Sequence, residues 1–130
     1  MVLLIVSDPE RKARLSAILR GLGLESLWVR QCLDARKLLK SCPPVEMVVT
    51  DASLSDSNWC DVLRVMVDCD TQANVVVVAP ASADEILWSE VMWRGVQDML
   101  VEPYTDAEAR RVLEGALRAC GHRRNVAAAS

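Results

Sequence analysis

The chain has 130 residues, and 52% of them are hydrophobic, so a single domain with its own core is expected and disorder is excluded. Its 18 acidic and 15 basic residues give a net charge of −3, which argues against direct binding of nucleic acid by this domain. No apolar run approaches the roughly 20 residues that span a membrane, and no basic segment precedes the first run. Neither a membrane span nor a signal peptide is therefore expected, and a cytoplasmic location is predicted.

Five short apolar runs alternate along the chain with segments of helical period. Near-continuous runs, such as the valines at 75–78, are typical of parallel strands that are covered on both faces. The sequence therefore predicts an α/β protein with five parallel strands. These strands are expected at residues 2–6, 26–30, 47–50, 75–79 and 98–101.

The first predicted helix has clear start and stop signals. Asp8 stands where it can cap the helix, and Pro9 occupies the first helical position. Gly21 and Gly23 are expected to end the helix, because glycine readily adopts the left-handed conformation found after helix C-termini.

The remaining helices are predicted from periodicity and capping. The second is expected at 34–39 and the third at about 58–69. Two capping boxes, in which Ser or Thr is followed three residues later by Glu, should open the fourth helix at Ser82 and the fifth at Thr105. Residues 121–130 have neither a stop signal nor an apolar period, so we expect a flexible tail or a linker stub there.

This alternation predicts one doubly wound, flavodoxin-like (βα)5 domain at residues 1–120, with strand order 2-1-3-4-5. Functional sites of such sheets lie at the carboxyl ends of the strands where the order reverses, here between the first and third strands. Asp8 and Asp51 stand at the ends of those two strands. Two acids on one rim predict a cation site, a phosphoacceptor, or both.

Four pieces of the sequence occur in the order and spacing of a known family. Over about residues 2–118 the chain resembles the receiver (REC) domain of bacterial two-component response regulators. The resemblance implies the (βα)5 fold, a role in phosphorelay signalling and a cis peptide bond before Pro103. The pieces are the turn Val6-Ser7-Asp8, Asp51 after the third strand, Arg94-Gly95-Val96, and Asp98-Met99-Leu100-Val101-Glu102-Pro103-Tyr104.

The resemblance also implies roles for residues at the rim. Asp51 stands at the position of the aspartate that accepts a phosphoryl group from a histidine kinase. Asp8, Asp51 and the backbone carbonyl of Ser53 stand where the family holds Mg²⁺, a hard cation that prefers oxygen ligands. Mg²⁺ is therefore the cofactor that the resemblance suggests, and a histidine kinase or another signalling protein is the expected partner.

Four positions of the site and of the family's switch depart from the family pattern. Ser7 replaces one acid of the metal-binding pair, and Ala79 replaces the Ser or Thr that bonds the phosphoryl group. Met99 stands where many receivers carry a Tyr or Phe that moves on activation. Glu102 replaces the lysine that pairs with the phosphoacceptor, so a cation becomes an anion beside Asp51.

The reversed charge at Glu102 decides the functional prediction. Two like charges about 5 Å apart repel by roughly 3 kcal/mol at an effective dielectric of 20. A phosphoryl group would bring about −1.5 to −2 more charge to a site that already holds three acids. We therefore predict an atypical or pseudo-receiver that acts mainly through protein–protein contacts, with weak or absent phosphorylation at Asp51. The alternative is a conventional receiver, phosphorylated on Asp51 by a histidine kinase with Mg²⁺.

Two tryptophans of the fourth helix are the predicted partner surface. Trp88 and Trp93 lie five residues apart, so one helical face cannot bury both. An exposed tryptophan is a good anchor for a protein partner. Receivers commonly dimerise through the fourth helix, fifth strand and fifth helix, so the resemblance makes a homodimer through this face a further expectation.

An enzyme is not predicted. On this fold, a flavodoxin needs a phosphate loop rich in Ser, Thr and Gly after the first strand, and a haloacid-dehalogenase-type phosphatase needs D-x-D there. Residues 7–11 carry neither pattern. The single histidine, His122, lies in the predicted tail, so no nucleophile with a paired base is visible.

Overall fold

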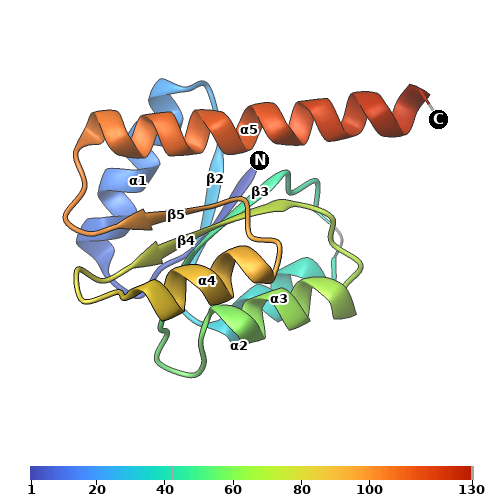
Figure 1. Ribbon diagram of the computed structural model, residues 1–130. Helices are drawn as coiled ribbons and strands as arrows, with labels where there is room; N and C mark the ends of the chain where they lie inside the picture. Colours follow the sequence, from blue (N-terminus) through green and yellow to red (C-terminus); the bar gives the residue numbers. More distant parts are fainter. Residues whose placement is uncertain (42, 130) are drawn as a thin grey trace.

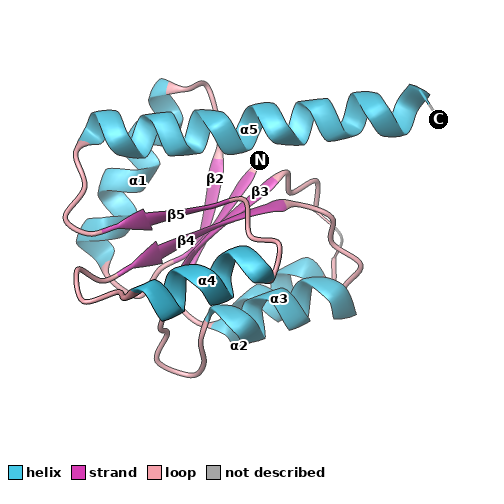
Figure 2. Cartoon of the chain, in the orientation of Figure 1, coloured by secondary structure: helices cyan, strands magenta, loops and turns pink. Residues whose placement is uncertain are grey.

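The computed structural model describes the backbone of residues 1–41 and 43–129 and the side chains of residues 1–41 and 43–119. Strands and helices alternate strictly along the described chain (Figures 1 and 2). In order they are β1 (Val2–Ile5), α1 (Pro9–Gly21), β2 (Ser26–Val29), α2 (Cys32–Leu39), β3 (Met47–Asp51), α3 (Trp59–Asp68), β4 (Asn74–Ala79), α4 (Glu85–Trp93), β5 (Asp98–Val101) and α5 (Asp106–Ala129).

The five strands form one parallel sheet in the order β2-β1-β3-β4-β5, which confirms the predicted topology. β1 lies between β2 and β3, so the strand order reverses at this point. Ile5 at the end of β1 pairs with Thr50, and Asp51 closes β3. The residues that follow β1 and β3 therefore meet at the same rim of the sheet.

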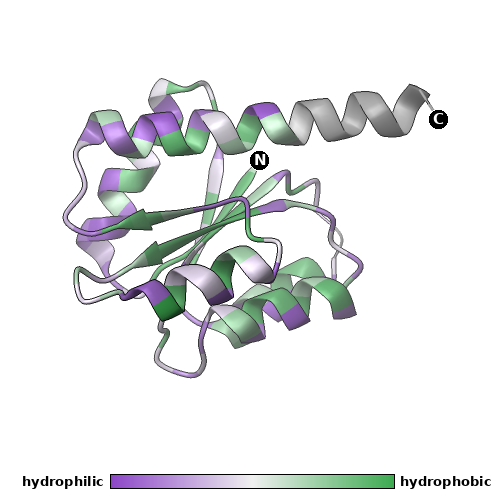
Figure 3. Ribbon diagram, viewed as in Figure 1, coloured by the Kyte–Doolittle hydropathy of each residue, from purple (hydrophilic) through white to green (hydrophobic). Residues whose placement is uncertain are grey.

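Helices cover both faces of the sheet (Figure 1). Side chains of α1 and α5 pack on one face against strand residues such as Leu4 and Val49. Side chains of α2, α3 and α4 pack on the other face against Leu3 and Val48. Because successive strand residues point to opposite faces, the central strands supply both cores and are apolar along their length (Figure 3).

Both ends of α1 form as the sequence predicts. The Oδ1 atom of Asp8 accepts a hydrogen bond from the N–H of Glu10 at 3.1 Å. At the other end Gly23 has a φ of +78°, and the N–H of Leu24 donates to the carbonyl of Leu19 at 3.0 Å. This is the Schellman arrangement, and α4 ends in the same way at Gly95, whose φ is +81°.

α2 begins earlier than the sequence predicts, at Cys32 rather than at residue 34. The reason is a cap from a distant segment. The two carboxylate oxygens of Asp56, in the loop after β3, accept hydrogen bonds from the N–H groups of Cys32 and Leu33, each at 3.1 Å. The loop that follows Asp51 is thereby attached to the first turn of α2.

The predicted N-cap residue is wrong for α4 and confirmed for α5. α4 is capped by Asp84 rather than Ser82, because the Oδ1 atom of Asp84 accepts from the N–H of Leu87 at 2.9 Å. Thr105 caps α5 as expected, since its hydroxyl accepts from the N–H of Glu108 at 3.1 Å.

α5 continues to Ala129, so its helical backbone enters the segment predicted as a tail. The side chains of residues 120–130 lie outside the described residues, and the domain boundary at residue 120 stays a prediction. Within the described part of the chain, no helix combines the length and the apolar character that a membrane span requires.

The cap that Asp56 provides predicts a pH dependence of stability. Desolvation is the largest single influence on this exposed carboxylate and works against ionisation, but the hydrogen bonds from the N–H groups of Cys32 and Leu33 and from Ser57 together outweigh it, so the pKa of Asp56 lies below its ordinary value. The stabilisation is therefore complete above the unfolded-state pKa of about 3.9 and is lost as the pH falls through the folded-state pKa. We expect Asp56→Ala to lower the free energy of unfolding at neutral pH by about 1 kcal/mol.

Urea unfolding of Asp56→Ala and the unaltered protein, from neutral to strongly acidic pH, checks this expectation. The difference between the two proteins should shrink in acid. Asp56→Asn is the matched control, because it keeps one acceptor oxygen without a charge and should show a smaller loss that does not change with pH. A loss for Asp56→Ala that is equally large in acid would contradict the assignment.

Candidate functional site

Asp51 lies at the rim of the sheet and is almost fully buried, with 3% of its surface exposed. Its Oδ2 atom accepts two hydrogen bonds from Ser7, one from the backbone N–H at 3.0 Å and one from the hydroxyl at 3.2 Å. Ser7 can reach it because β1 and β3 are neighbours. The residue that replaces an acid of the predicted metal pair is therefore a double donor to Asp51.

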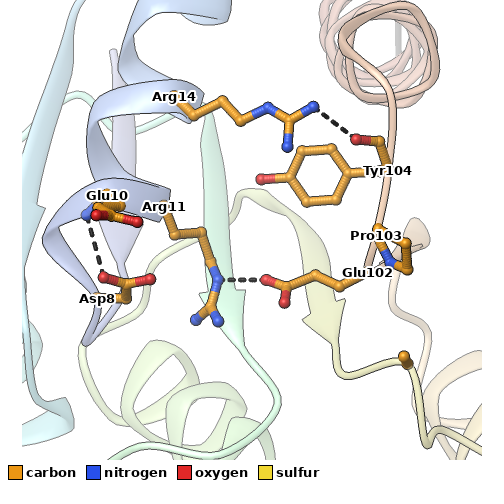
Figure 4. Close-up of a pocket in the computed structure, with 8 residues that line it drawn as sticks. Asp8, Glu10, Arg11, Arg14, Glu102, Pro103 and Tyr104 are labelled. Atoms are coloured by element: carbon orange, nitrogen blue, oxygen red, sulfur yellow. Dashed lines mark hydrogen bonds and ion pairs between the residues drawn. The ribbon is translucent and has the colours of Figure 1, made fainter.

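Arg11, in the first turn of α1, forms ion pairs with Asp51 at the end of β3 and Glu102 just after β5. Its Nη1 atom lies 2.8 Å from Oδ1 of Asp51, and its Nε atom donates to Oε1 of Glu102. Figure 4 shows the Arg11 side chain extending from α1 toward Glu102, with Asp8 nearby. One guanidinium thus connects the ends of β3 and β5, and the site has mixed charge instead of the purely acidic character predicted from the sequence.

A second arginine of α1 holds the neighbouring loop without touching Asp51. Arg14 donates to the carbonyl of Tyr104 at 2.6 Å and lies over its ring, with 4.6 Å between the guanidinium carbon and the ring centroid (Figure 4). It also forms an ion pair with Asp106 at 3.0 Å. Arg14 therefore fixes the start of α5 against α1.

The ends of β4 and β5 carry the other positions compared with the receiver pattern. The peptide bond between Glu102 and Pro103 is cis, as the resemblance implies. The N–H of Glu102 donates to the carbonyl of Ala79 at 3.0 Å, so the ends of β4 and β5 are adjacent. Ala79 and Met99 are both buried in the core beneath α4. Neither position offers a hydroxyl or an aromatic ring beside the rim.

Two adjoining clefts flank the Arg11 side chain. Asp51 and Ser53 line a cleft of about 230 Å³, and Asp8 lines another of about 400 Å³, while Arg11 and Glu102 line both. The three oxygen donors predicted for Mg²⁺ are of the type that this ion prefers. They are divided between the two clefts, however, with the guanidinium on Asp51. In the part of the chain with described side chains, no group of three acids, histidines or cysteines could hold a metal ion.

For Asp51 and for Arg11 alike, burial and the neighbouring charges shift the pKa in opposite directions. Burial is the largest influence on Asp51 and raises its pKa above the ordinary value, while the bonds from Ser7 and the charge of Arg11 offset only part of this. Burial alone would lower the pKa of Arg11, but Asp51 and Glu102 together raise it. Arg11 therefore stays charged, and the ionised form of Asp51 is costly even with its partners.

Arg11 is the site residue that the sequence analysis missed. Its position held a signal that could have revealed it, because the first turn of a helix that follows β1 lies at the same rim as Asp51. An acid at Glu102, next to another acid, also requires a nearby cation. Periodicity does not reveal such a partner, because it reports which face of a helix is apolar and not which charges meet across segments.

The predicted partner surface is exposed. Trp93 has 89% of its surface accessible and Trp88 has 38%, and two further apolar residues of α4, Ile86 and Met92, are exposed as well. Val91 anchors the opposite side of α4 in the core. The outer surface of α4 is therefore unusually apolar for a helix that faces solvent.

No family model matches the chain, and no curated protein matches it. Among solved structures, it is similar to the signal receiver domain of an HD domain-containing protein from Pseudomonas fluorescens Pf-5, with 21% identity, a TM-score of 0.80, and coverage of 93% of this chain and 96% of that one. It is also similar to a response regulator receiver domain from Clostridium thermocellum, with 18% identity, a TM-score of 0.79, and coverage of 91% and 94%.

A third similar structure is the receiver domain of the sensor histidine kinase PA1611 from Pseudomonas aeruginosa PAO1, which has a magnesium ion coordinated in its active site cleft. The identity is 19% and the TM-score 0.74, with coverage of 89% of this chain and 95% of that one. In all three cases the alignment covers almost the whole domain. The chain therefore has the fold of the receiver domains of two-component systems.

Proposed function

We propose that this chain is an atypical receiver domain of a two-component signalling system, that it acts mainly through protein–protein contacts, and that Asp51 is phosphorylated weakly or not at all. The observation that carries the proposal is that both carboxylate oxygens of Asp51 already have donors. These donors are Ser7 and Arg11, and only 3% of the residue is exposed. A phosphoryl donor would have to displace these partners.

The surroundings of Asp51 support the same conclusion. Glu102 stands where the receiver family has a lysine, and Arg11 offsets its charge without adding a free cation for a phosphoryl group. Ala79 has no hydroxyl with which to bond a modified Asp51. Met99 is buried in the core and cannot act as the aromatic switch of the family.

Asp8, Asp51 and the carbonyl of Ser53 would be the ligands of Mg²⁺ in this domain. When bound, the ion would neutralise charge on a phosphoryl group. The magnesium in the receiver domain of PA1611 supports this choice of cofactor. Because Arg11 already neutralises Asp51, we propose that Mg²⁺ binds more weakly here than in a receiver with an acidic pair after β1.

Protein contacts are proposed at α4. Trp88 and Trp93, together with the exposed Ile86 and Met92, form an apolar surface of the kind that anchors partners. The partner is a histidine kinase or another signalling protein, or a second copy of the chain through α4, β5 and α5. The acidic balance of the sequence favours such partners over nucleic acid, and we place the domain in the cytoplasm.

A conventional receiver is the second candidate function. The position of Asp51 at the end of β3, beside the strand-order reversal, favours it, because this is where the family accepts phosphate. In that case Mg²⁺ binding would have to displace Arg11 from Asp51.

Incubation with acetyl phosphate and Mg²⁺, followed by intact-protein mass spectrometry, tests the proposal. We expect the spectrum to show mainly unmodified protein, because Arg11 and Ser7 occupy the carboxylate. Asp51→Asn is the control that identifies the site of any adduct. A stoichiometric, long-lived phosphoryl adduct that is absent from Asp51→Asn would establish the conventional receiver instead.

A further inference from the structure

We infer that Arg11 is the resident cation of this site, and that its guanidinium and Mg²⁺ exclude one another at Asp51. The inference deepens the proposed function and relies on it only for the choice of Mg²⁺ as the competing ion. Arg11 is then a positioning residue, which holds Asp51 and Glu102 together at the rim and takes no part in chemistry.

The guanidinium of Arg11 occupies the position between Asp51 and Glu102. Arg11 reaches both acids at once, with Nη1 at 2.8 Å from Oδ1 of Asp51 and Nε donating to Glu102. The other oxygen of Asp51, Oδ2, is held by the backbone and hydroxyl of Ser7. Asp51 therefore has no oxygen free of a donor in this arrangement.

The clefts show why the ion and the side chain compete. Arg11 lines the cleft of Asp51 and Ser53 and also the cleft of Asp8. A cation that joined these three donors would have to lie where the guanidinium separates them. Two positive charges on one buried carboxylate repel strongly, so binding of Mg²⁺ requires Arg11 to leave.

Of the two neighbouring arginines Arg11 and Arg14, only Arg11 contacts Asp51 and Glu102. Arg14 is one turn further along α1, and its partners are Asp106 and the carbonyl of Tyr104. It lines the cleft of Asp8 but not that of Asp51. Arg14 therefore supplies a matched control for any effect of removing a positive charge from this helix.

Isothermal titration calorimetry with magnesium chloride tests the inference. We expect Arg11→Gln to bind Mg²⁺ at least about tenfold more tightly than the unaltered protein, because the competing charge is gone. Arg14→Gln should bind it as the unaltered protein does. If Arg11→Gln is folded and binds Mg²⁺ no more tightly than the unaltered protein, the inference is wrong.

A second measurement on the unaltered protein keeps the inference testable even if Arg11→Gln does not fold. In ¹⁵N NMR spectra recorded during a magnesium titration, the Nε–H signal of Arg11 should move together with the backbone amide signal of Asp51. The two signals report the same exchange of guanidinium for metal. Movement of the Asp51 signal while the Arg11 signal stays in place would show that both cations are held together, which overturns the inference.

These outcomes are separate from those that test the proposed function. Stoichiometric phosphorylation of the unaltered protein would refute the proposed function, whereas tighter Mg²⁺ binding by Arg11→Gln would still support the role of Arg11. Conversely, unchanged Mg²⁺ affinity in a folded Arg11→Gln refutes the role of Arg11 and leaves the phosphorylation test unaffected.

Discussion

Arg11→Met is expected to lower the free energy of unfolding at neutral pH by about 2–3 kcal/mol, because it leaves a buried carboxylate without its charge partner. Asp51 has only 4% of its side chain exposed, and within the described chain Arg11 is the one cation that pairs with it. Methionine keeps most of the apolar stem of the arginine, so the loss reports charge more than packing. Urea unfolding monitored by circular dichroism measures it.

Arg14→Met is the matched control for this variant. Its ion pair with Asp106 is exposed, with 45% and 77% of the two side chains accessible, so its loss should cost about 1 kcal/mol or less. An equal loss in the two variants would show that Arg11 stabilises the domain through its stem and not through Asp51.

A double-mutant cycle with Asp51→Asn separates the pair from its surroundings. Burial raises the pKa of Asp51, so its ionised form costs stability at neutral pH, and stability is gained as the pH falls through the folded-state pKa and the group is protonated. Asp51→Asn alone should therefore stabilise the protein. In that background Arg11→Met should cost much less, which gives a coupling free energy of about 2 kcal/mol. The cost of Arg11→Met in the unaltered background should likewise shrink as the pH falls and Asp51 is protonated.

The fold could be predicted from the sequence because its signals are local. The apolar runs have strand length, and the glycines at 23 and 95 stand where helices end in the left-handed conformation. The strand order follows from the alternation of strands and helices together with the handedness of their connections. The caps that were predicted wrongly or missed are those that local sequence does not settle. Asp84 competes with Ser82 two residues away, and Asp56 caps α2 from a different loop.

The site could be predicted in its positions but not in its charge. The topology alone brings the ends of β1, β3 and β5 to one rim, so Ser7, Asp51 and Glu102 were foreseeable neighbours. That Arg11 joins two of them depends on the length and direction of one side chain. An arginine on the first turn of a helix usually faces solvent, and only its contacts across 40 and 91 positions of sequence distinguish this one.

The same contacts show which elements are attached to the rim. With Ala79 and Met99 in the core, the route from the rim to α4 lacks the groups that receivers use. The loop after Asp51 is instead attached to α2 through Asp56, and Arg11 attaches α1 to β3 and β5. The rim is therefore attached to α1 and α2 through side-chain contacts of Arg11 and Asp56.

Glu102→Lys is expected to raise the rate at which acetyl phosphate modifies Asp51 by at least about tenfold, since removal of a negative charge from the cleft of Asp51 and addition of a cation both favour the incoming phosphoryl group. The substitution also deprives Arg11 of its second partner and loosens its hold on Asp51. Mass spectrometry of timed samples measures the rate, and Asp51→Asn in the same background should abolish the adduct. Glu102→Gln, which removes the acid without adding a cation, should fall between the two. Rates equal to that of the unaltered protein in both variants would show that the charge at this position does not limit phosphorylation, and would leave the burial of Asp51 beneath Arg11 as the barrier.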